Sequence, residues 1–508
     1  MSFNPSPRFL TVCFFSCFAL SAADTVPPDV RSALNVIQAN ELKGDLSFLA
    51  SDLLQGRYTP SPGLDIAAEF IASKFRAAGL EPVANGGYFQ LAEMVVRHPA
   101  AGSALTAKTA EGTINVPAEF VHPGNVSAPA HIADAPIVVF AKLDPDLLKN
   151  ADVAGKAVVV PALEQISRAT VLAMRAFNRA LIPLKPAIEI MVNNKKQPQP
   201  ADRLLFAEDA AQPSLALLNV NSKELLDWVH HNSHGAAGAT LSVDVAAPDD
   251  QKVTVKNVIG ILRGSDLALK DSCVLLTAHY DHIGTTQTAG NSAVPAPQTD
   301  DHIFNGANDD GSGTVSVIEV ARALAHLNPH PKRSIVFMTF FGEERGEFGS
   351  QFYCRHPVFP IAKTVADINL EQVGRTDATT GKQIKTASLT GYDYSEVTEF
   401  LEKAGKQTGI KVYKDDEASD AYFTRSDNAA LAEQGVPAHS LTVAFDYPDY
   451  HRVGDEWQKI DYDNMAAVDR MVALALVNIA NTSRAPAWNT DNPKTEPFRQ
   501  AQKNLATP

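Results

Sequence analysis

The sequence predicts an α/β protein whose central sheet is mixed but largely parallel and is covered by helices on both faces. Apolar runs of strand length, such as CVLLTAH at 273–279 and SIVFMTFF at 334–341, recur in the second half of the chain. They are continuously apolar, which is typical of strands buried on both faces of a parallel sheet. Segments with helical spacing, such as GTVSVIEVARALAHL at 313–327, separate these runs. Strand and helix therefore alternate, as a sheet covered on both faces requires.

The N-terminus has the order of a secretory signal peptide. Arg8 precedes the apolar run FLTVCFFSCFAL, and the small residues 21–23 follow it. The run is too short for a normal membrane span, and no other stretch is long and apolar enough to cross a bilayer. We therefore expect residues 1–23 to be a signal peptide and the protein to be secreted or periplasmic.

Composition excludes several function classes. The 508 residues suffice for two or three domains, and the net charge of −14 comes without a basic cluster, so nucleic acid and anionic membrane surfaces are not expected partners. Only Cys273 and Cys354 follow the signal segment, which is too few for a disulfide framework. Cys273 lies in an apolar run and is expected to be a small buried side chain.

Residues 24–104 are predicted to form the N-terminal part of the main domain. Residues 24–40 have the composition of a loose leader. The patterns LKGDLSFLASDLLQGR at 42–57 and DIAAEFIASKFRAAGL at 65–80 then predict two amphipathic helices, the second closed by Gly79.

Residues 105–250 are predicted to form an inserted, β-rich domain. Short strands such as APIVVFAK and KAVVVPA dominate, with helical patches at 166–180 and 222–232. Turn residues are frequent, and clusters of acidic and basic side chains are absent. This region is therefore not expected to perform chemistry.

Residues 251–485 are predicted to form the main α/β domain. Strands are expected at VKNVIGILRG, CVLLTAH, SIVFMTFF, VADINL and HSLTVAF, and helices at 313–327, 395–409 and 462–481. A long polar loop at 285–301 interrupts the pattern. Residues 486–508 are predicted to be a C-terminal tail that trails over the surface.

Five segments of the main domain, most of them directly after a predicted strand, supply an imidazole or a carboxylate. In a parallel sheet, the carboxyl ends of the strands meet at one edge, where reactive groups gather. Singly, each residue has an ordinary explanation, such as a surface histidine, a helix cap or a solvated acidic turn. Together they predict one joint site, made of His279 with Asp281, Asp309 with Asp310, Glu343 with Glu344, Glu371, and His451.

The residue types at this site favour bound zinc. Two histidines and several carboxylates without cysteine suit a borderline hydrolytic metal, and two ions are expected if one carboxylate bridges them. Paired ions polarise an oxygen and lower the pKa of a bridging water, whose proton a free carboxylate must accept. Of the adjacent pair Glu343 and Glu344, one would bind metal and the other would act as the base.

Five motifs resemble those of the co-catalytic zinc aminopeptidases related to bacterial leucyl aminopeptidase. They are HYDHIG, NGANDDGSG, FFGEERGEFGS, INLEQVGR and YHRVGDEW, and their order covers nearly all of 255–480. Relatives within this family include glutamate carboxypeptidase II, the transferrin receptor and glutaminyl cyclase. The resemblance implies a zinc exopeptidase-like fold. More weakly, residues 105–250 resemble a protease-associated domain, which implies an influence on substrate access.

The resemblance also implies a metal ligand for each of five positions. Asp309 would bridge two zinc ions, while its neighbours Asn308 and Asp310 have no ligand role. Glu371 stands where the family has Asp, so the metal at this position is expected to be weaker or missing. The implied ligands are His279 and Glu371 for one zinc, Glu344 and His451 for the other, and Asp309 for both.

Three further residues receive catalytic roles from the resemblance. Glu343 is the implied general base, and Asp281 would orient His279 through its second ring nitrogen. Tyr450 would hydrogen-bond the tetrahedral oxyanion or simply pack. The segment RSDN at 425–428 resembles a family segment RSDH, with Asn428 in place of histidine, and leaves the role of Asp427 open.

The expected function is that of a secreted zinc metallo-exopeptidase acting on peptide substrates, most consistent with an aminopeptidase in which Glu343 takes a proton from a zinc-activated water. One alternative is another specificity on the same scaffold, either carboxypeptidase-like cleavage or glutaminyl cyclisation. The other is a non-catalytic, receptor-like binding protein, which would lack zinc and chelator-sensitive activity.

Overall fold

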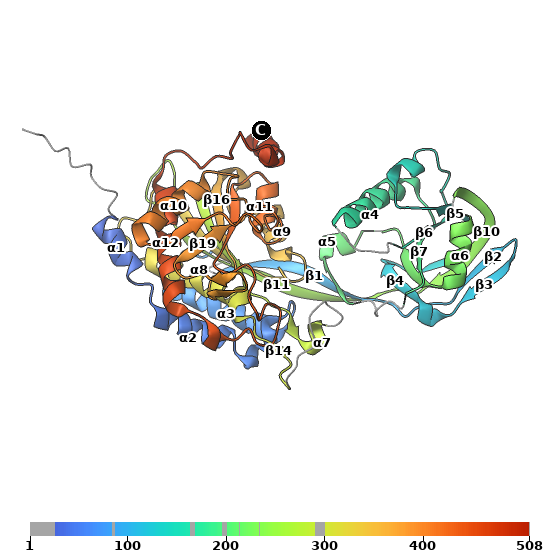
Figure 1. The fold of residues 1–508 in the computed structure, drawn as a ribbon, viewed down its shortest axis with the longest axis horizontal. Helices are drawn as coiled ribbons and strands as arrows, with labels where there is room; N and C mark the ends of the chain where they lie inside the picture. Colours follow the sequence, from blue (N-terminus) through green and yellow to red (C-terminus); the bar gives the residue numbers. More distant parts are fainter. Residues whose placement is uncertain are drawn as a thin grey trace, which may run out of the picture.

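The structure, a computed structural model, describes residues 26–83, 87–162, 168–195, 201–212, 214–232, 234–289 and 300–506. Two lobes are evident, each organised around its own sheet and joined by long strands (Figure 1). The predicted signal peptide at 1–23 lies outside the described residues. So does much of the loop predicted at 285–301.

The larger lobe contains a nine-stranded sheet with parallel strands at its centre. There β12 pairs in parallel with β15 and β16, and β16 pairs in parallel with β21, while β11 and β1 add antiparallel strands on one side. The mixed, largely parallel centre agrees with the sequence-based expectation. In spatial order the strands are β20 (Lys411–Tyr413), β19 (Thr386–Leu389), β21 (Ala438–Thr442), β16 (Thr364–Leu370), β12 (Cys273–His279), β15 (Ser334–Phe340), β11 (Asp249–Leu262), β1 (Phe89–His98) and β8 (Arg203–Phe206).

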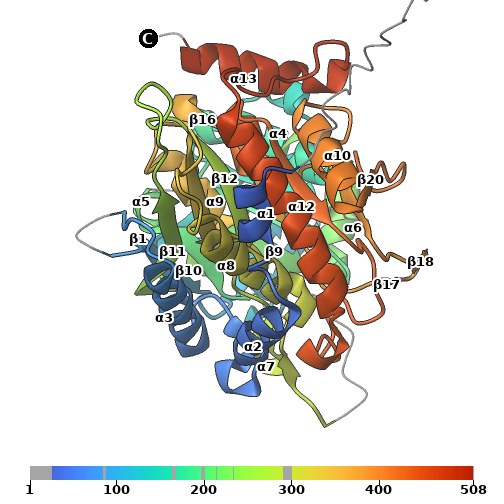
Figure 2. The ribbon, with the colours of Figure 1, turned by 90° about the vertical axis from the view of Figure 1, so that its left-hand side faces the viewer.

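Both faces of this sheet are covered by helices. Along β12, Val274 and Leu276 join one hydrophobic core and Cys273 and Leu275 join the other, because successive side chains of a strand point to opposite faces. Figure 2 shows α1, α8 and α12 across the first face. Helices of the first core include α2 (Ala39–Leu49), α3 (Pro62–Ala77), α8 (Gly313–Leu324), α10 (Val397–Thr408) and α12 (Tyr462–Asn481); α11 (Asn428–Glu433) and α13 (Glu496–Ala506) pack in the second.

The N-terminal segment is ordered, contrary to the expectation of a loose leader at 24–40. Helix α1 (Pro28–Leu34) buries Val30, Ala33 and Leu34, which the helical spacing places on one side. Pro28 suits the first turn because its missing N–H would have no partner there. The side chain of Arg470 then donates to the carbonyl of Ile37, so the segment is fixed to helix α12.

The C-terminal segment also differs from the expected surface tail at 486–508. Trp488 is 3 % exposed, and its indole N–H donates to the carbonyl of Gly435 at 2.9 Å. Its ring stacks on that of Phe498, with centroids 5.1 Å apart. Burial of the Trp488 ring and partial burial of Phe498 stabilise the segment by a few kcal/mol, since full burial of one large side chain contributes about 1.5–3 kcal/mol, and this outweighs the polar composition of the segment.

The smaller lobe contains an eight-stranded sheet with its own cores. Strands β5, β6, β7 and β9 run parallel at its centre, flanked by helices α4 (Arg168–Leu181) and α6 (Lys223–His231). In spatial order the strands are β3 (Gly112–Val116), β2 (Leu105–Thr109), β10 (His234–Val245), β5 (Ala130–Phe140), β6 (Ala157–Pro161), β7 (Ile188–Asn193), β9 (Leu217–Asn221) and β4 (Val121–Asn125).

One strand within the predicted insertion at 105–250 belongs to the other lobe. Strand β8 pairs with β1 at the edge of the nine-stranded sheet. The cause is apolar packing, because Leu204 and Phe206 are buried and the Phe206 ring contacts Phe348 edge-on, with centroids 5.2 Å apart. The chain therefore returns to the larger lobe once before completing the smaller one.

Candidate metal centre

The carboxyl ends of the central parallel strands bring the predicted residues together. Strand β12 ends at His279, β16 ends just before Glu371, and β15 ends three residues before Glu343. Because these strands run in one direction, their ends lie at one edge of the sheet. Asp309 reaches the same edge from the segment that precedes helix α8.

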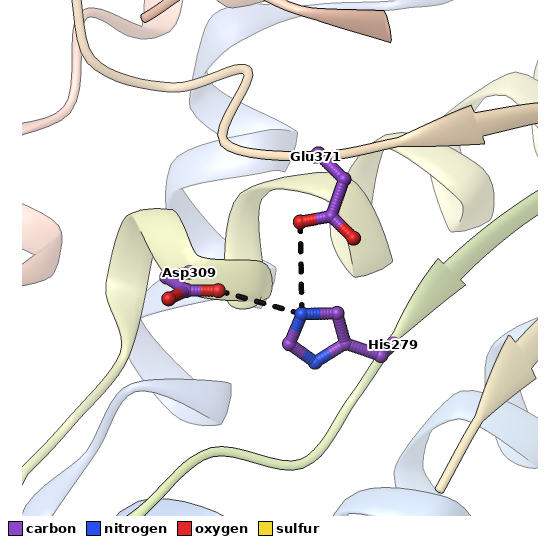
Figure 3. Close-up of side chains that lie close together, drawn as sticks. All are labelled: His279, Asp309 and Glu371. Atoms are coloured by element: carbon purple, nitrogen blue, oxygen red, sulfur yellow. Dashed lines mark ion pairs between the residues drawn. The ribbon is translucent and has the colours of Figure 1, made fainter. Parts of the chain in front are cut away.

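The first group of side chains surrounds the ring of His279 (Figure 3). Its Nε2 lies 3.4 Å from Asp309 Oδ1, 3.7 Å from Glu371 Oε2 and 3.9 Å from Glu343 Oε2. His279, Asp309 and Glu371 each offer a ligand atom, and the three atoms lie within 4.8 Å of one another. All are largely shielded from solvent, so this group can hold a metal ion.

A second group shares Asp309. His451 Nε2 lies 3.1 Å from Asp309 Oδ2 and 3.3 Å from Glu344 Oε2. Asp309 thus turns one oxygen toward each imidazole, as a carboxylate bridging two ions would. His282, which was not among the predicted ligands, also offers a ligand atom within 4.8 Å of those of Asp309 and Glu344. The repeated histidine in HYDHIG was the available sequence signal for it.

Hydrogen bonds fix the carboxylates in place. Glu371 Oε1 accepts from the hydroxyl of Ser426 and from Asn369 Nδ2, the latter at 3.3 Å. The peptide N–H of Asp309 donates to Asp455 Oδ2 at 3.1 Å, and the hydroxyl of Tyr447 donates to the same oxygen at 3.0 Å. Asp455 therefore positions the segment that presents Asp309.

Asp310 links three parts of the edge, consistent with the absence of a ligand role. Its carboxylate accepts from the peptide N–H groups of His279, Gly313 and Gln372 at 3.1–3.3 Å. Full burial raises the pKa of this carboxyl well above its usual value. The side chain is used to join strands β12 and β16 to helix α8.

Asp281 contacts the segment of Glu343 more closely than the ring that it was expected to orient. His279 Nδ1 lies 3.2 Å from the main-chain carbonyl oxygen of Asp281 and 3.6 Å from its carboxylate. The carboxylate instead accepts from the hydroxyl of Thr59 at 3.0 Å and from the peptide N–H of Glu343 at 3.1 Å. These two donors draw the carboxylate away from the ring.

A buried arginine that the sequence did not single out holds two of the site loops. The guanidinium of Arg57 donates to the carbonyl oxygens of Tyr280 at 2.8 Å, Asn305 at 2.7 Å and Gly306 at 2.9 Å. Burial lowers the pKa of Arg57 to about 10, which still leaves it charged at neutral pH. Arg57 thereby fixes the loop after β12 against the segment leading to Asp309.

The site has more acidic groups than its imidazoles can neutralise. Burial, together with the charges of Glu344 and Glu371, raises the pKa of Glu343 well above its usual value. For Asp309, burial acts to raise the pKa, but hydrogen bonds from His279 and His451 outweigh it and lower the pKa well below the usual value. Divalent cations would relieve this crowding, so the donor set fits metal ions.

Tyr450 lies at the rim. It is 40 % exposed, and its ring stacks on His451 with centroids 4.1 Å apart. It lines a cavity of about 130 Å³ with Glu371 and Arg425. In the RSDN segment, Asn428 accepts from the hydroxyl of Ser440 at 2.8 Å and so has a structural role.

The residues gathered at this edge can hold metal ions, and comparisons with known proteins relate the chain to zinc peptidases. A probable zinc metalloprotease of Pyrenophora teres f. teres is 26 % identical over 248 residues, 46 % of this chain and 50 % of the relative. Aminopeptidase YwaD of Bacillus subtilis is 26 % identical over 240 residues, 46 % of each chain. This chain therefore spans about half the length of these curated relatives.

Residues 257–476 match Peptidase family M28. The solved aminopeptidase from Aneurinibacillus sp. strain AM-1 has the same fold, with a TM-score of 0.56 and 18 % identity over 91 % of this chain and 97 % of that one. The predicted family, the mixed α/β fold and the hydrolase class are confirmed.

The expected secreted or periplasmic location is wrong. Relatives from Pyrenophora tritici-repentis, Tuber melanosporum and Candida albicans are named vacuolar membrane proteases, and these names contradict export. Among the helices that the structure describes, none has the length and apolar character needed to cross a membrane. The expectation rested on residues 1–23, which lie outside the described part of the chain.

Proposed function

We propose that this protein is a zinc-dependent aminopeptidase that binds two ions and removes N-terminal residues from peptides. The observation that supports this most directly is the position of Asp309 between His279 and His451, with one carboxylate oxygen toward each ring. A single carboxylate shared in this way serves two cations. The relative named aminopeptidase YwaD supports the same assignment.

Two sets of side chains would hold the ions. His279 and Glu371 would bind one, Glu344 and His451 the other, and Asp309 both. The chemistry that bound zinc supplies at such a site is polarisation of the scissile carbonyl and a lower pKa for the attacking water.

Glu343 is the general base in this proposal. Its carboxylate is 15 % exposed and stands beside the ligands, with Oε2 3.9 Å from His279 Nε2. It would accept the proton of the attacking water and pass it to the leaving amine. The hydrogen bond from its peptide N–H to Asp281 fixes the turn that aims the side chain.

The cavity beside Glu371 would receive the first side chain of the substrate. Its wall includes Tyr450, whose hydroxyl would donate to the tetrahedral oxyanion. The pocket is small, about 130 Å³, which suits one amino-acid side chain better than a continuous peptide.

We further propose that the smaller lobe, the predicted protease-associated-like domain, limits substrate access. Arg345 donates to the carbonyl of Asp202 at 3.0 Å, and Arg355 forms an ion pair with Glu208 at 2.7 Å, so both hold the β8 segment through which the chain of the smaller lobe returns to the larger one. A cavity of about 1110 Å³ is lined by Arg175 of α4 together with Glu347 and other residues of the larger lobe. Peptides reaching the site would pass along this cavity.

The test is an assay of the full chain against aminoacyl substrates and acyl-capped peptides, with and without a chelator. We expect cleavage only of substrates with a free amino end, and loss of that cleavage with chelator. Glu343→Gln should retain zinc and lower kcat by about 10²–10⁴-fold, because the amide cannot accept the proton. Undiminished turnover in this variant would remove Glu343 from the role of base. Cleavage of capped peptides alone would reject the aminopeptidase assignment.

A further inference from the structure

The loop after β12 places a second histidine inside the site. His282 is fully buried, and its peptide N–H donates to the carbonyl of Arg57 at 3.3 Å. Its ring lies against Gly306, where a Cβ atom would stand 2.4 Å from His282 Cγ. Gly306 also has a φ of 56°, so glycine satisfies both the close approach and the backbone conformation. The backbone at Gly306 therefore leaves room for the His282 ring.

Neither ring nitrogen of His282 has a hydrogen-bond partner among the described residues. Nδ1 lies 2.9 Å from Glu344 Oε1, a contact that is an ion pair when the ring is protonated, whereas Nε2 has no partner among the described residues. Leaving a buried polar atom unsatisfied is unfavourable by about 1–3 kcal/mol. The unpartnered Nε2 and the close approach of Nδ1 to a carboxylate oxygen indicate a ligand at this place.

The surrounding atoms identify that ligand as a cation. Glu344 turns its other oxygen to His451 Nε2 at 3.3 Å, and the same nitrogen lies 3.1 Å from Asp309. The rings of His282 and His451 meet edge-on, with centroids 5.6 Å apart. Two imidazoles and two carboxylates therefore face a common point.

We propose that His282 is an additional ligand of the ion held by Glu344, His451 and Asp309. This inference rests on the proposed function, since it assumes a two-ion site. It makes the two positions unequal: one ion has two imidazoles, whereas the ion at His279 and Glu371 has one. Imidazole nitrogen favours zinc over magnesium, calcium and manganese, so the ion at His282 is a zinc that a chelator removes last.

The experiment compares wild type with His282→Asn in the full chain. Asparagine keeps a polar side chain that can hydrogen-bond Glu344 but is a poor zinc ligand. Zinc per chain is measured by mass spectrometry after equilibration with graded chelator. We expect the tighter wild-type site to weaken by at least about 100-fold in the variant, with the weaker site unchanged. His326→Asn, at an exposed position, is the matched control.

A second measurement applies even if the variant does not fold. X-ray absorption of the zinc-loaded wild type should give about 1.5 imidazoles per zinc, from three histidines over two ions, against about 1.0 without His282. A value of 1.0, or a His282→Asn variant that binds both ions as wild type does, overturns the inference while leaving peptidase activity in place. A wild-type chain with neither zinc nor activity would overturn the proposed function as well.

Discussion

The two sheets of this protein have similar parallel centres, but the side chains at their strand ends have different roles. Each has four adjacent parallel strands, β15-β12-β16-β21 in the larger lobe and β5-β6-β7-β9 in the smaller. In the smaller lobe, polar side chains near the strand ends accept from nearby peptide N–H groups: Asn193 from Lys195, and Ser222 from Leu225. These oxygens are satisfied locally, and among the described residues no group of candidate metal ligands lies at these strand ends.

In the larger lobe, the strand-end side chains face one another instead. His279, Asp309 and Glu371 meet across three segments of the chain, and the peptide N–H groups of this edge are satisfied by separate residues, Asp310 and Asp455. Because Asp310 and Asp455 accept the peptide N–H groups, the ligand atoms remain available for a cation. A parallel sheet thus offers a place for a site, and the side chains placed there decide whether one exists.

The largest expected effect comes from Asp309→Ala. Because Asp309 faces both imidazoles, its loss should remove both ions. Metal ions contribute several kcal/mol of charge stabilisation, and each 1.36 kcal/mol is tenfold in rate, so turnover should fall by about 10⁴-fold. Zinc content and kcat are measured together, with exposed Asp271→Ala as control. Retention of both ions would show that Asp309 does not bridge.

A smaller effect is expected for Glu371→Asp. Asp is the family residue at this position, but here Ser426 and Asn369 hold the longer glutamate. Shortening the side chain withdraws it from these donors, so one ion should bind about 10–100-fold more weakly, with the other unchanged. Chelator competition measures both constants. Tighter binding in the variant would show that the backbone at this position matches aspartate.

Contacts such as those of Ser426 and Asn369 with Glu371 could not be predicted from the sequence. The strands were recognisable from their apolar runs, and the ligands from the polar residues that follow them, because both signals are local. Arg57 was missed because its partner Tyr280 lies 223 positions away, and nothing local indicates the pairing. Strand β8 was misplaced for a similar reason, since its pairing with β1 depends on a distant aromatic cluster.

The role of each residue in the site was harder to predict than which residues form the site. Asp281 lies two residues from His279, and the family resemblance implied a carboxylate-to-ring contact. The competing donors, Thr59 and the peptide N–H of Glu343, are visible only in three dimensions. His282 stood in the same motif, but only the burial of its ring and its position beside Asp309 and Glu344 distinguish a ligand from a packed histidine.

Among its described residues, the smaller lobe has one buried carboxylate without a cationic partner, and the stability of the lobe should depend on pH. Glu189 on β7 is 1 % exposed, and burial raises its pKa from 4.5 to about 7. The folded state therefore favours the protonated form: the stabilisation is complete below pH 4.5 and is lost as pH rises toward 7, by up to about 3 kcal/mol. Glu189→Gln should equal wild type near pH 4 and be more stable at pH 8.

Urea unfolding of the full chain at both pH values measures this difference, and exposed Glu224→Gln on the same lobe is the control. The same pH dependence in Glu189→Gln and wild type would assign the effect to another group. Zinc binding should not change, because Glu189 lies in the sheet whose strand ends hold no candidate metal group among the described residues.

The smallest effect is expected for a change at Ser222, a polar residue near a strand end whose hydroxyl is hydrogen-bonded within the smaller lobe. The Ser222 hydroxyl accepts from the peptide N–H of Leu225 at 3.2 Å and caps helix α6, which buries Leu225 and Val229. Ser222→Ala should destabilise the smaller lobe by about 1 kcal/mol, whereas Ser222→Thr keeps the hydroxyl and should lose less. Urea unfolding gives the free-energy change, and zinc content and kcat should be unaltered in both variants. If Ser222→Ala instead lowered zinc content, a polar group of the smaller lobe would take part in the metal centre, and the distinction between the two sheets would fail.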